Sequence, residues 1–298
     1  MAAIQVPPPV LQRIDASSQS LGEGMPIRRA LPTRERRLVG PWCFLDHFGP
    51  VDVTRGPGMR VGPHPHIGLQ TVTWLYEGEV LHRDSLGCVQ PIRPGQLNLM
   101  TSGQGISHSE ESPAQRPAML HGVQFWIVLP DSARNGAPAF DHYAELPRVE
   151  HQGLQCTVLV GSALGADSPA RMRWPVMGVD VRIEGAADAL LPLDPDFEHA
   201  VLVTIGSAQV EGETLEPGML LYLGGQRSGL RLRAGAGARL VLIGGRPFEE
   251  PVVMWWNFVA RSKPELSVAC REWNQGDAKF GEVEGYDGAR LAAPVPPW

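Results

Sequence analysis

Four side chains of metal-binding type lie in two short, similarly spaced pairs. His64 and His66 form the first pair, and His108 and Glu110 form the second. Residues i and i+2 of a β-strand project from the same face, so each pair points in one direction. If the two strands face each other across a barrel, three imidazoles and one carboxylate converge on one point. Such a set of ligands binds first-row divalent metals.

A single His-x-His pair occurs often by chance, and an exposed histidine needs no ligand. Two pairs in strand context, each beside a glycine turn, favour a metal site over that simpler interpretation. The strand parity of the first pair continues through Gln70, Val72, Trp74 and Tyr76. We therefore expect these four residues to line the same interior, mostly with apolar walls.

Three other histidines lie close to the two pairs in sequence. We expect His47, between Asp46 and Phe48, to be a core histidine with its own hydrogen-bond partner. His82 follows a turn and is expected to be exposed or to pack away from the pocket. His121 opens an apolar run and is a weak candidate for a residue that supports the ligands by hydrogen bonding without binding the metal.

The elements that must position these residues are strands. Apolar runs are separated by turns at 77–78 and 94–95. Residues 201–210 repeat the strand and turn of residues 74–80, and the Pro-Gly turn at 217–218 repeats the one at 94–95. Internal repetition of a strand-rich unit predicts two barrels in tandem. The second copy carries neither metal pair, so we expect no metal there.

We predict that residues 1–138 form the metal-binding barrel with the start of a linker, and that residues 139–298 form the second barrel. A short helix is expected over 141–145, within the polar linker region. Ser262, with a glutamate three residues later, predicts a helix start, and Gly276 predicts its end. The Gly-, Ala- and Pro-rich segment after this helix is expected to be a loose arm.

Several of these segments resemble one known family. Residues 64–73 (HPHIGLQTVT) resemble the first signature of the pirin family, within the cupin superfamily, and residues 94–110 resemble its second signature. Residues 40–50 resemble the pirin amino-terminal segment, and residues 250–259 are similar to its carboxy-terminal domain. The resemblance implies an all-β fold of two tandem antiparallel cupin barrels (double-stranded β-helices), followed here by the short carboxy-terminal helix.

The resemblance also implies a ligand set. By position, His64, His66, His108 and Glu110 would bind one divalent metal, Fe(II) first, with Mn, Ni, Co, Cu or Zn as alternatives. Gln70 is a departure, because most pirins carry a glutamate there. In pirin-like proteins that position is not the principal carboxylate ligand, so we still expect the metal site to form. The glutamine does not support an acid–base role for residue 70.

Two functions follow from the resemblance. The first is a mononuclear metal-dependent dioxygenase that cleaves flavonols such as quercetin with O2 and releases carbon monoxide. Glu110 would then be both a ligand and the general base that takes the flavonol proton, and Trp74 and Tyr76 would hold the planar ring. The alternative is an iron-dependent redox switch, a transcriptional cofactor that binds a protein partner without turnover. Surface arginines would then form its contact face. The sequence has an arginine cluster at Arg28, Arg29, Arg34, Arg36 and Arg37, for which pairing with local acids on a solvated surface is the favoured interpretation. A metal-holding protein without activity is a third interpretation.

The composition limits the partners. A formal charge of −6 gives no general attraction to nucleic acid or anionic membranes. No apolar run approaches the length of about 20 residues that a membrane helix needs. The four cysteines are widely spaced and predict neither a disulfide framework nor a zinc–thiolate site. We expect a soluble, cytoplasmic and monomeric protein that binds neither nucleic acid nor membranes.

Overall fold

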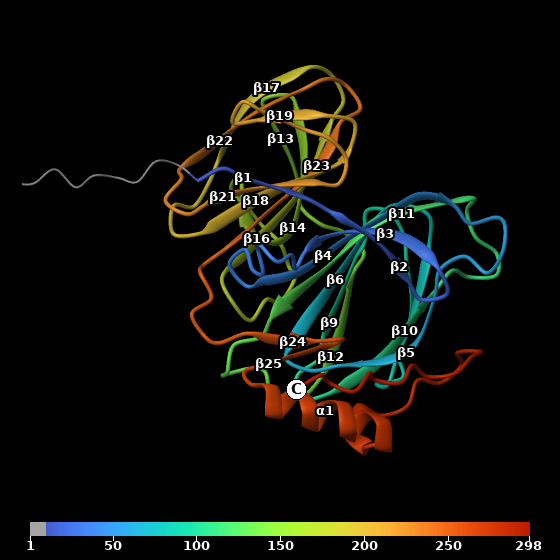
Figure 1. Cartoon of the computed structure of the whole chain (residues 1–298). Helices are drawn as coiled ribbons and strands as arrows, with labels where there is room; N and C mark the ends of the chain where they lie inside the picture. Colours follow the sequence, from blue (N-terminus) through green and yellow to red (C-terminus); the bar gives the residue numbers. More distant parts are fainter. Residues whose placement is uncertain (1–9) are drawn as a thin grey trace, which may run out of the picture.

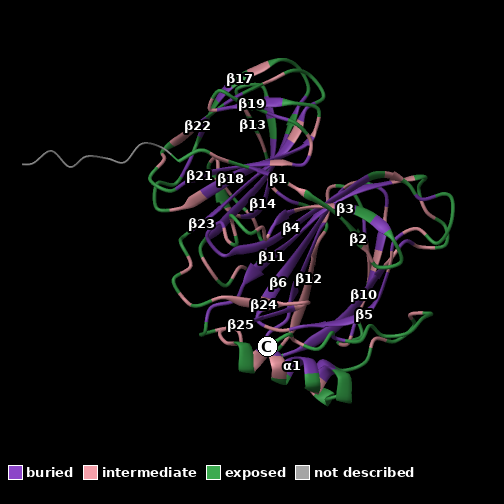
Figure 2. Ribbon diagram, viewed as in Figure 1, coloured by how far each residue is buried: buried purple, intermediate pink, exposed green. Residues whose placement is uncertain are grey.

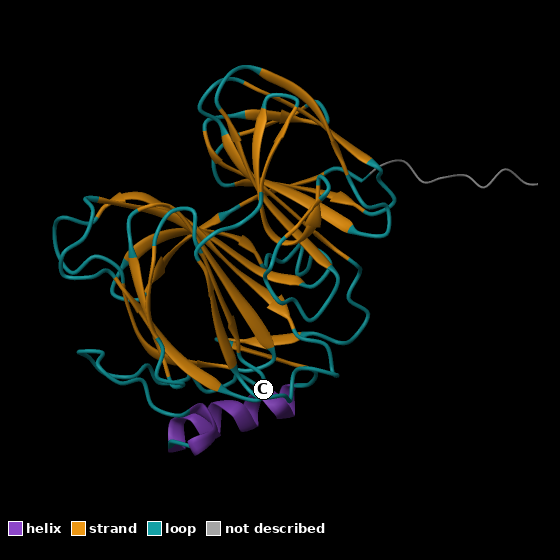
Figure 3. Ribbon diagram, turned by 180° about the vertical axis from the view of Figure 1, so that it is seen from behind, coloured by secondary structure: helices purple, strands orange, loops and turns teal. Residues whose placement is uncertain are grey.

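The computed structural model describes residues 10–298 and contains two antiparallel β-barrels in tandem, with one α-helix near the carboxy terminus (Figure 1). Each barrel consists of one large sheet and one four-stranded sheet. Seen from behind, the helix lies beneath the first barrel and away from the second (Figure 3). This architecture confirms the predicted fold class.

The first barrel holds the two metal-ligand pairs. In spatial order, its seven-stranded sheet contains β12 (Ala139–Tyr143), β9 (Leu97–Thr101), β6 (Leu69–Glu77), β11 (Met119–Val128), β4 (Trp42–Asp52), β3 (Met25–Leu31) and β2 (Ser17–Leu21). Its four-stranded sheet contains β5 (Arg60–His66), β10 (Ile106–Glu111), β7 (Val80–Asp84) and β8 (Val89–Ile92).

The second barrel has the same construction. Its larger sheet contains β1 (Gln12–Asp15), β21 (Met219–Gly224), β18 (Glu198–Ile205), β23 (Arg239–Gly245), β16 (Val176–Ile183), β14 (Leu154–Ala163) and β13 (Arg148–His151), with β15 (Ala166–Asp167) paired to β14. Its smaller sheet contains β17 (Ala187–Pro192), β22 (Gly229–Ala234), β19 (Ala208–Val210) and β20 (Glu213–Leu215).

Each barrel is completed by elements from the opposite end of the chain. Strand β1 pairs with β21 of the second barrel, with Gln12 opposite Tyr222. At the other end, the β24–β25 hairpin (Val253–Trp255 and Phe258–Ala260) and α1 lie against the first barrel (Figure 1). The predicted boundary between residues 138 and 139 stays a prediction.

Residues 141–145 do not form the predicted helix. Asp141 to Tyr143 belong to β12, which pairs with β9 in the register Phe140 to Met100. Strand β9 would otherwise be an edge strand with unpaired N–H and C=O groups, and pairing with β12 satisfies them. The helix prediction was wrong because this tertiary pairing outweighs a weak local preference.

Helix α1 (Lys263–Gln275) begins and ends where the sequence predicts. The Ser262 hydroxyl accepts a hydrogen bond from the Glu265 N–H, and Gly276 closes the helix at φ 77° in the left-handed region. Its buried residues are Leu266, Ala269, Cys270 and Trp273. The short 3-10 helix η1 (Ala278–Phe280) follows.

The segment after these helices is not the loose arm that the sequence predicted. The Leu291 N–H donates to the Pro63 carbonyl at 2.8 Å. The Trp273 indole N–H donates to the Leu291 carbonyl at 2.7 Å. These bonds hold the tail between α1 and β5, the edge strand of its sheet. The Pro63 carbonyl on β5 thereby gains a hydrogen-bond partner that the edge of the sheet does not provide.

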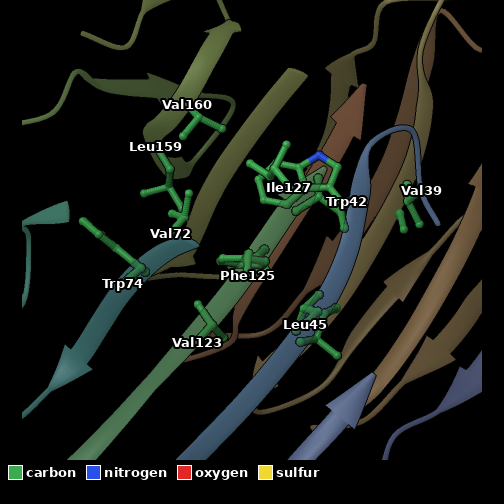
Figure 4. Packing of buried hydrophobic residues seen from close by; sticks show 14 of the residues in the cluster. Val39, Trp42, Leu45, Val72, Trp74, Val123, Phe125, Ile127, Leu159 and Val160 are labelled. Carbon is green, nitrogen blue, oxygen red and sulfur yellow. The ribbon is translucent and has the colours of Figure 1, made fainter. Parts of the chain in front are cut away.

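A hydrophobic cluster joins the two barrels (Figure 4). Trp42 and Phe125 of the first barrel pack edge to face, with ring centroids 5.2 Å apart. Leu159 and Val160 of the second barrel belong to the same cluster. The Trp42 indole N–H donates to the Gly244 carbonyl at 2.8 Å, so this tryptophan both packs and bonds across the interface.

The two interiors differ in polarity, although both are buried (Figure 2). A purely hydrophobic cluster of Leu, Val, Ile, Ala, Met and Cys side chains fills the second barrel. In the first barrel, histidine, threonine, glutamine and carboxylate side chains are buried as well. Buried polar groups need partners or a ligand, so the polar interior is where a functional site is expected.

Candidate metal centre

The first pair of histidines lies on β5 and faces β10. His64 is opposite His108 in the antiparallel ladder, and Pro65 is opposite Ser107. Strand β5 is at the edge of its sheet, where a proline does not break a ladder on both sides. The His-Pro-His sequence is therefore compatible with a strand that brings three imidazoles together.

The ring nitrogens of His64, His66 and His108 lie within 4.8 Å of one another. The Nε2 atoms of His66 and His108 are 3.0 Å apart. Two imidazole nitrogens bound to one ion at about 2.1 Å, and at right angles to each other, are separated by about 3.0 Å. The spacing therefore fits a metal ion between these nitrogens.

Backbone carbonyls fix the proton position on two of these rings. His64 donates from Nδ1 to the Gly62 carbonyl, and His66 donates from Nδ1 to the Asn257 carbonyl, each at 2.9 Å. A carbonyl oxygen only accepts, so the proton of each neutral ring is on Nδ1 and the Nε2 lone pair is free. Both Nε2 atoms are thus ready to bind a metal.

Burial keeps the three rings neutral. It lowers the pKa of His64 to about 4, although the Gly62 carbonyl acts in the opposite direction. Burial and the neighbouring histidines lower the pKa values of His66 and His108 well below the usual range. Neutral imidazole is the form that binds metal ions, so the cluster is in its ligating form at pH 7.

Glu110 lies beside the cluster, in a different group of ligand atoms. The β10 register shifts between His108 and Glu110, and the Glu110 carboxylate groups with His82 and His108 but not with the β5 histidines. Its Oε1 accepts a hydrogen bond from the Gln124 amide at 2.9 Å. Burial raises the pKa of Glu110, opposed by His82 and by hydrogen bonds from Gln124 and Thr73.

His82 was placed wrongly by the sequence analysis. It is 4% exposed, and its Nε2 lies 3.0 Å from the Asp84 carboxylate. Its Nδ1 lies 3.4 Å from Nδ1 of His108. His82 and Asp84 are a third pair at spacing i, i+2, so the signal used for the other two pairs was also available here.

The expected walls of the pocket also differ. Gly68 has φ 71° between β5 and β6 and resets the strand parity. The Gln70 amide donates to Thr101. Val72 and Trp74 face the second barrel in the interface cluster. The expectation that these residues and Tyr76 share an interior with the β5 histidines was therefore wrong.

Trp74 and Tyr76 instead line a cavity of about 300 Å³ between the barrels. The bidentate Arg239–Asp180 pair lines it too. The aromatic rings near the metal cluster are different ones. Trp126 lies edge to face with His66, at a centroid distance of 5.0 Å, and Phe140 stacks on His82 at 4.4 Å.

His47 and His121 form a separate buried pair. Their Nε2 atoms are 2.8 Å apart, so one ring donates to the other. Burial lowers the pKa of His47 to about 3 and that of His121 to about 4. The prediction of a bonded core histidine at position 47 is confirmed, and His121 is its partner.

Arg28, Arg29 and Arg36 of the amino-terminal arginine cluster form hydrogen bonds within the chain. Arg29 forms a bidentate pair with Asp46 at 2.8 Å. Arg36 donates to the Gln12 side chain.

All four cysteines, which lie within the described residues, are free. Among residues 10–298, no helix combines the length and the apolar character needed to cross a bilayer.

Two tandem barrels, with a cluster of imidazoles inside the first, define a bicupin with a candidate metal centre. Both groups of three potential metal ligands found among residues 10–298 lie in this first barrel. Residues 24–127 match the Pirin family model, and residues 178–281 match the model of the Pirin C-terminal cupin domain. The chain belongs to the pirin family.

Similar proteins extend over almost the whole chain. A Pseudomonas aeruginosa protein named "Putative quercetin 2,3-dioxygenase PA1205" is 49% identical and is matched over 97% of this chain and 91% of its own length. A Pirin-like protein of Caulobacter vibrioides is 36% identical over 91% of this chain and 95% of its own. The crystal structure of a quercetin 2,3-dioxygenase from Acinetobacter baumannii superimposes with a TM-score of 0.94. It is 47% identical and covers 96% of each chain.

Proposed function

We propose that this protein is a mononuclear metal-dependent dioxygenase that cleaves flavonols such as quercetin with O2. The observation that carries the proposal is the convergence of three neutral imidazoles beside a buried carboxylate. A relative that is 49% identical and carries a quercetin 2,3-dioxygenase name supports this choice of reaction.

In this proposal His64, His66, His108 and Glu110 hold one divalent ion. Fe(II) is our first choice, with Mn, Ni, Co, Cu and Zn as alternatives, because imidazole and carboxylate ligands accept all of them. When bound, the ion supplies Lewis-acid and redox chemistry at the point where the three rings converge. The rings themselves stay neutral and keep their Nε2 atoms directed at this point.

Glu110 is the general base. Its Oε1 accepts a hydrogen bond from the Gln124 amide, so Oε2 would be both the ligand atom and the acceptor of the proton from the flavonol hydroxyl. Burial raises the pKa of Glu110, which makes its carboxylate a stronger base than that of an exposed glutamate. Trp126 and Phe140, the aromatic rings packed on the histidines, take the role of holding the planar substrate.

The test is aerobic loss of quercetin absorbance by metal-free protein reloaded separately with Fe, Mn, Ni, Co or Cu. We expect turnover that requires a metal, disappears in His108→Ala and persists in His151→Ala. His151 is a suitable control because it lies in the second barrel and bonds the Leu190 carbonyl. Stoichiometric metal binding without turnover for any ion would contradict the dioxygenase proposal and leave the metal site intact.

The alternative is an iron-dependent redox-switch protein without turnover. Binding of a protein partner that differs between the ferrous and ferric forms, in a protein that does not consume quercetin, would favour it. A cytoplasmic location and a monomeric state stay predictions.

A further inference from the structure

We propose that Asp84 and His82 are positioning residues that fix the proton of His108 on Nδ1, so that its Nε2 faces the metal. The proposal rests on the metal site proposed above and assigns a role to two residues outside the ligand set. The three side chains lie on adjacent strands, with Asp84 opposite His108 and His82 opposite Glu110 in the β7–β10 ladder.

The chain of contacts begins at a fixed carboxylate. Oδ1 of Asp84 accepts hydrogen bonds from the backbone N–H groups of Leu86 at 2.9 Å and Cys88 at 3.1 Å. Its other oxygen, Oδ2, lies 3.0 Å from Nε2 of His82. A carboxylate oxygen only accepts, so Nε2 of His82 carries a proton and Nδ1 of the neutral ring carries a lone pair.

That lone pair faces the metal ligand. Nδ1 of His82 lies 3.4 Å from Nδ1 of His108. A hydrogen bond between two ring nitrogens needs one proton. Because Nδ1 of His82 carries a lone pair, this proton is on Nδ1 of His108. Nε2 of His108 then has its lone pair free, 3.0 Å from Nε2 of His66. The distance of 3.4 Å makes this contact a weak bond, so its effect is to select a tautomer.

The three proposed histidine ligands thus share one arrangement, in which an acceptor holds the Nδ1 proton. His64 and His66 use the backbone carbonyls of Gly62 and Asn257. Only His108 uses a side chain. The His82 ring is held in place by Phe140, which stacks on it with an interplanar angle of 16°. Because side chains form this relay, substitution can break it.

Asp84→Asn is the most direct test. The two backbone N–H groups of Leu86 and Cys88 require an oxygen at the Oδ1 position, so the amide NH2 must face His82. The amide then donates to Nε2 of His82, so the proton of the His82 ring moves to Nδ1. There it faces the Nδ1 proton of His108, and the hydrogen bond between the two rings is lost. We expect the affinity for Zn(II), measured by competition with a chromogenic chelator, to fall by about 10–100-fold.

A double-mutant cycle separates the relay from simple loss of charge. His82→Phe keeps the stacking on Phe140 and removes both ring nitrogens. We expect Asp84→Asn to have no further effect on Zn(II) affinity in the His82→Phe background, because the carboxylate acts through His82. His82→Asn retains an acceptor near the Nδ1 position and is expected to recover part of the affinity. Glu111→Gln, which removes one carboxylate from the same sheet, is the control and should stay within about two-fold of the wild type.

Three results would contradict the proposal. The first is an unchanged Zn(II) affinity in Asp84→Asn, and the second is an equal effect of Asp84→Asn on Zn(II) affinity with and without His82. The third is an Nδ1–H tautomer of His82 in nitrogen NMR spectra of the Zn(II)-loaded wild type. The expected spectrum has the proton on Nε2 of His82. Thermal denaturation of each metal-free variant checks that it is folded. If the wild type binds no Zn(II), or if His64→Ala binds it equally well, the metal site itself is contradicted.

Discussion

Nδ1 of His66 donates a hydrogen bond of 2.9 Å to the backbone carbonyl of Asn257, which lies 191 residues later in the sequence. The contact is part of a short parallel bridge in which Ile67 lies beside Phe258. A segment that follows the second barrel therefore determines which nitrogen of a first-barrel histidine is free. The candidate metal centre therefore depends on segments that lie far apart in the sequence.

Phe258→Ala should weaken metal binding from outside the ligand set. Phe258 is fully buried, and its loss is expected to lower the free energy of unfolding by about 3–5 kcal/mol. It should also loosen the neighbouring Asn257 carbonyl and reduce Zn(II) affinity at a temperature where the variant is folded. Val268→Ala, at a residue 37% exposed on α1, is the control. Unchanged Zn(II) affinity in a destabilised Phe258→Ala would contradict this link.

Gln124→Leu should separate metal binding from catalysis. It removes the donor to Oε1 of Glu110, and hydrogen bonds to charged groups contribute about 1.5–3 kcal/mol. We expect kcat/KM for quercetin to fall about 10–100-fold, with one metal per chain retained by elemental analysis. Gln104→Leu, at an exposed position, should leave both quantities unchanged. Wild-type kcat/KM in Gln124→Leu would show that the proton acceptor needs no such support.

The His47–His121 pair should make the protein sensitive to acid. Burial holds the pKa values at about 3 and about 4, below about 6.5 in the unfolded chain. Above pH 6.5 both states are neutral and the pair contributes no pH dependence. Below it only the unfolded state takes up protons, so stability falls by about 1.4 kcal/mol per pH unit for each histidine.

His121→Asn should therefore have a shallower loss of stability than the wild type. The difference between pH 6.5 and 5 is expected to be about 2 kcal/mol. Urea denaturation of the metal-free wild type and the metal-free variant measures this difference. The ligand histidines then titrate equally in both proteins and do not affect the comparison. Parallel stability curves over this range would contradict the assignment of the acid effect to the pair.

Trp42→Phe should weaken the contact between the barrels. The substitution removes the donor to the Gly244 carbonyl and leaves a small gap in the interface cluster. We expect a loss of about 1–3 kcal/mol in urea denaturation. Trp255→Phe is a matched control, because its indole N–H also donates to a carbonyl, that of Pro294, but it packs away from the interface cluster. A similar loss in both variants would show that the interface location of Trp42 adds nothing.

Local periodicity was sufficient to predict the parts of the site that lie within single strands. The i, i+2 spacing of His64 and His66 places their rings on one face, and their convergence with His108 follows from the β5–β10 register. The same rule failed beyond His66, because Gly68 takes a left-handed conformation and begins a new strand in another sheet. A single glycine thus changed which barrel face Trp74 occupies.

Other features depend on contacts between distant segments. The role of β12 as a strand is fixed by pairing with β9, and the sequence of residues 141–145 alone does not contain that information. The hydrogen bond from His66 to Asn257 is of the same kind. His82 is different, since its spacing to Asp84 was visible and only its burial was misjudged. Burial of a polar strand residue depends on which sheet covers it.

The pairing of β1 with β21 has a consequence for biosynthesis. At about 5–20 residues per second, about 10–40 s pass between the emergence of Gln12 and of Tyr222 from the ribosome. During that interval β1 has no sheet to join. The nascent first barrel is also without the carbonyl of Asn257, so the Nδ1 proton of His66 gains its acceptor only after the second barrel has been synthesised.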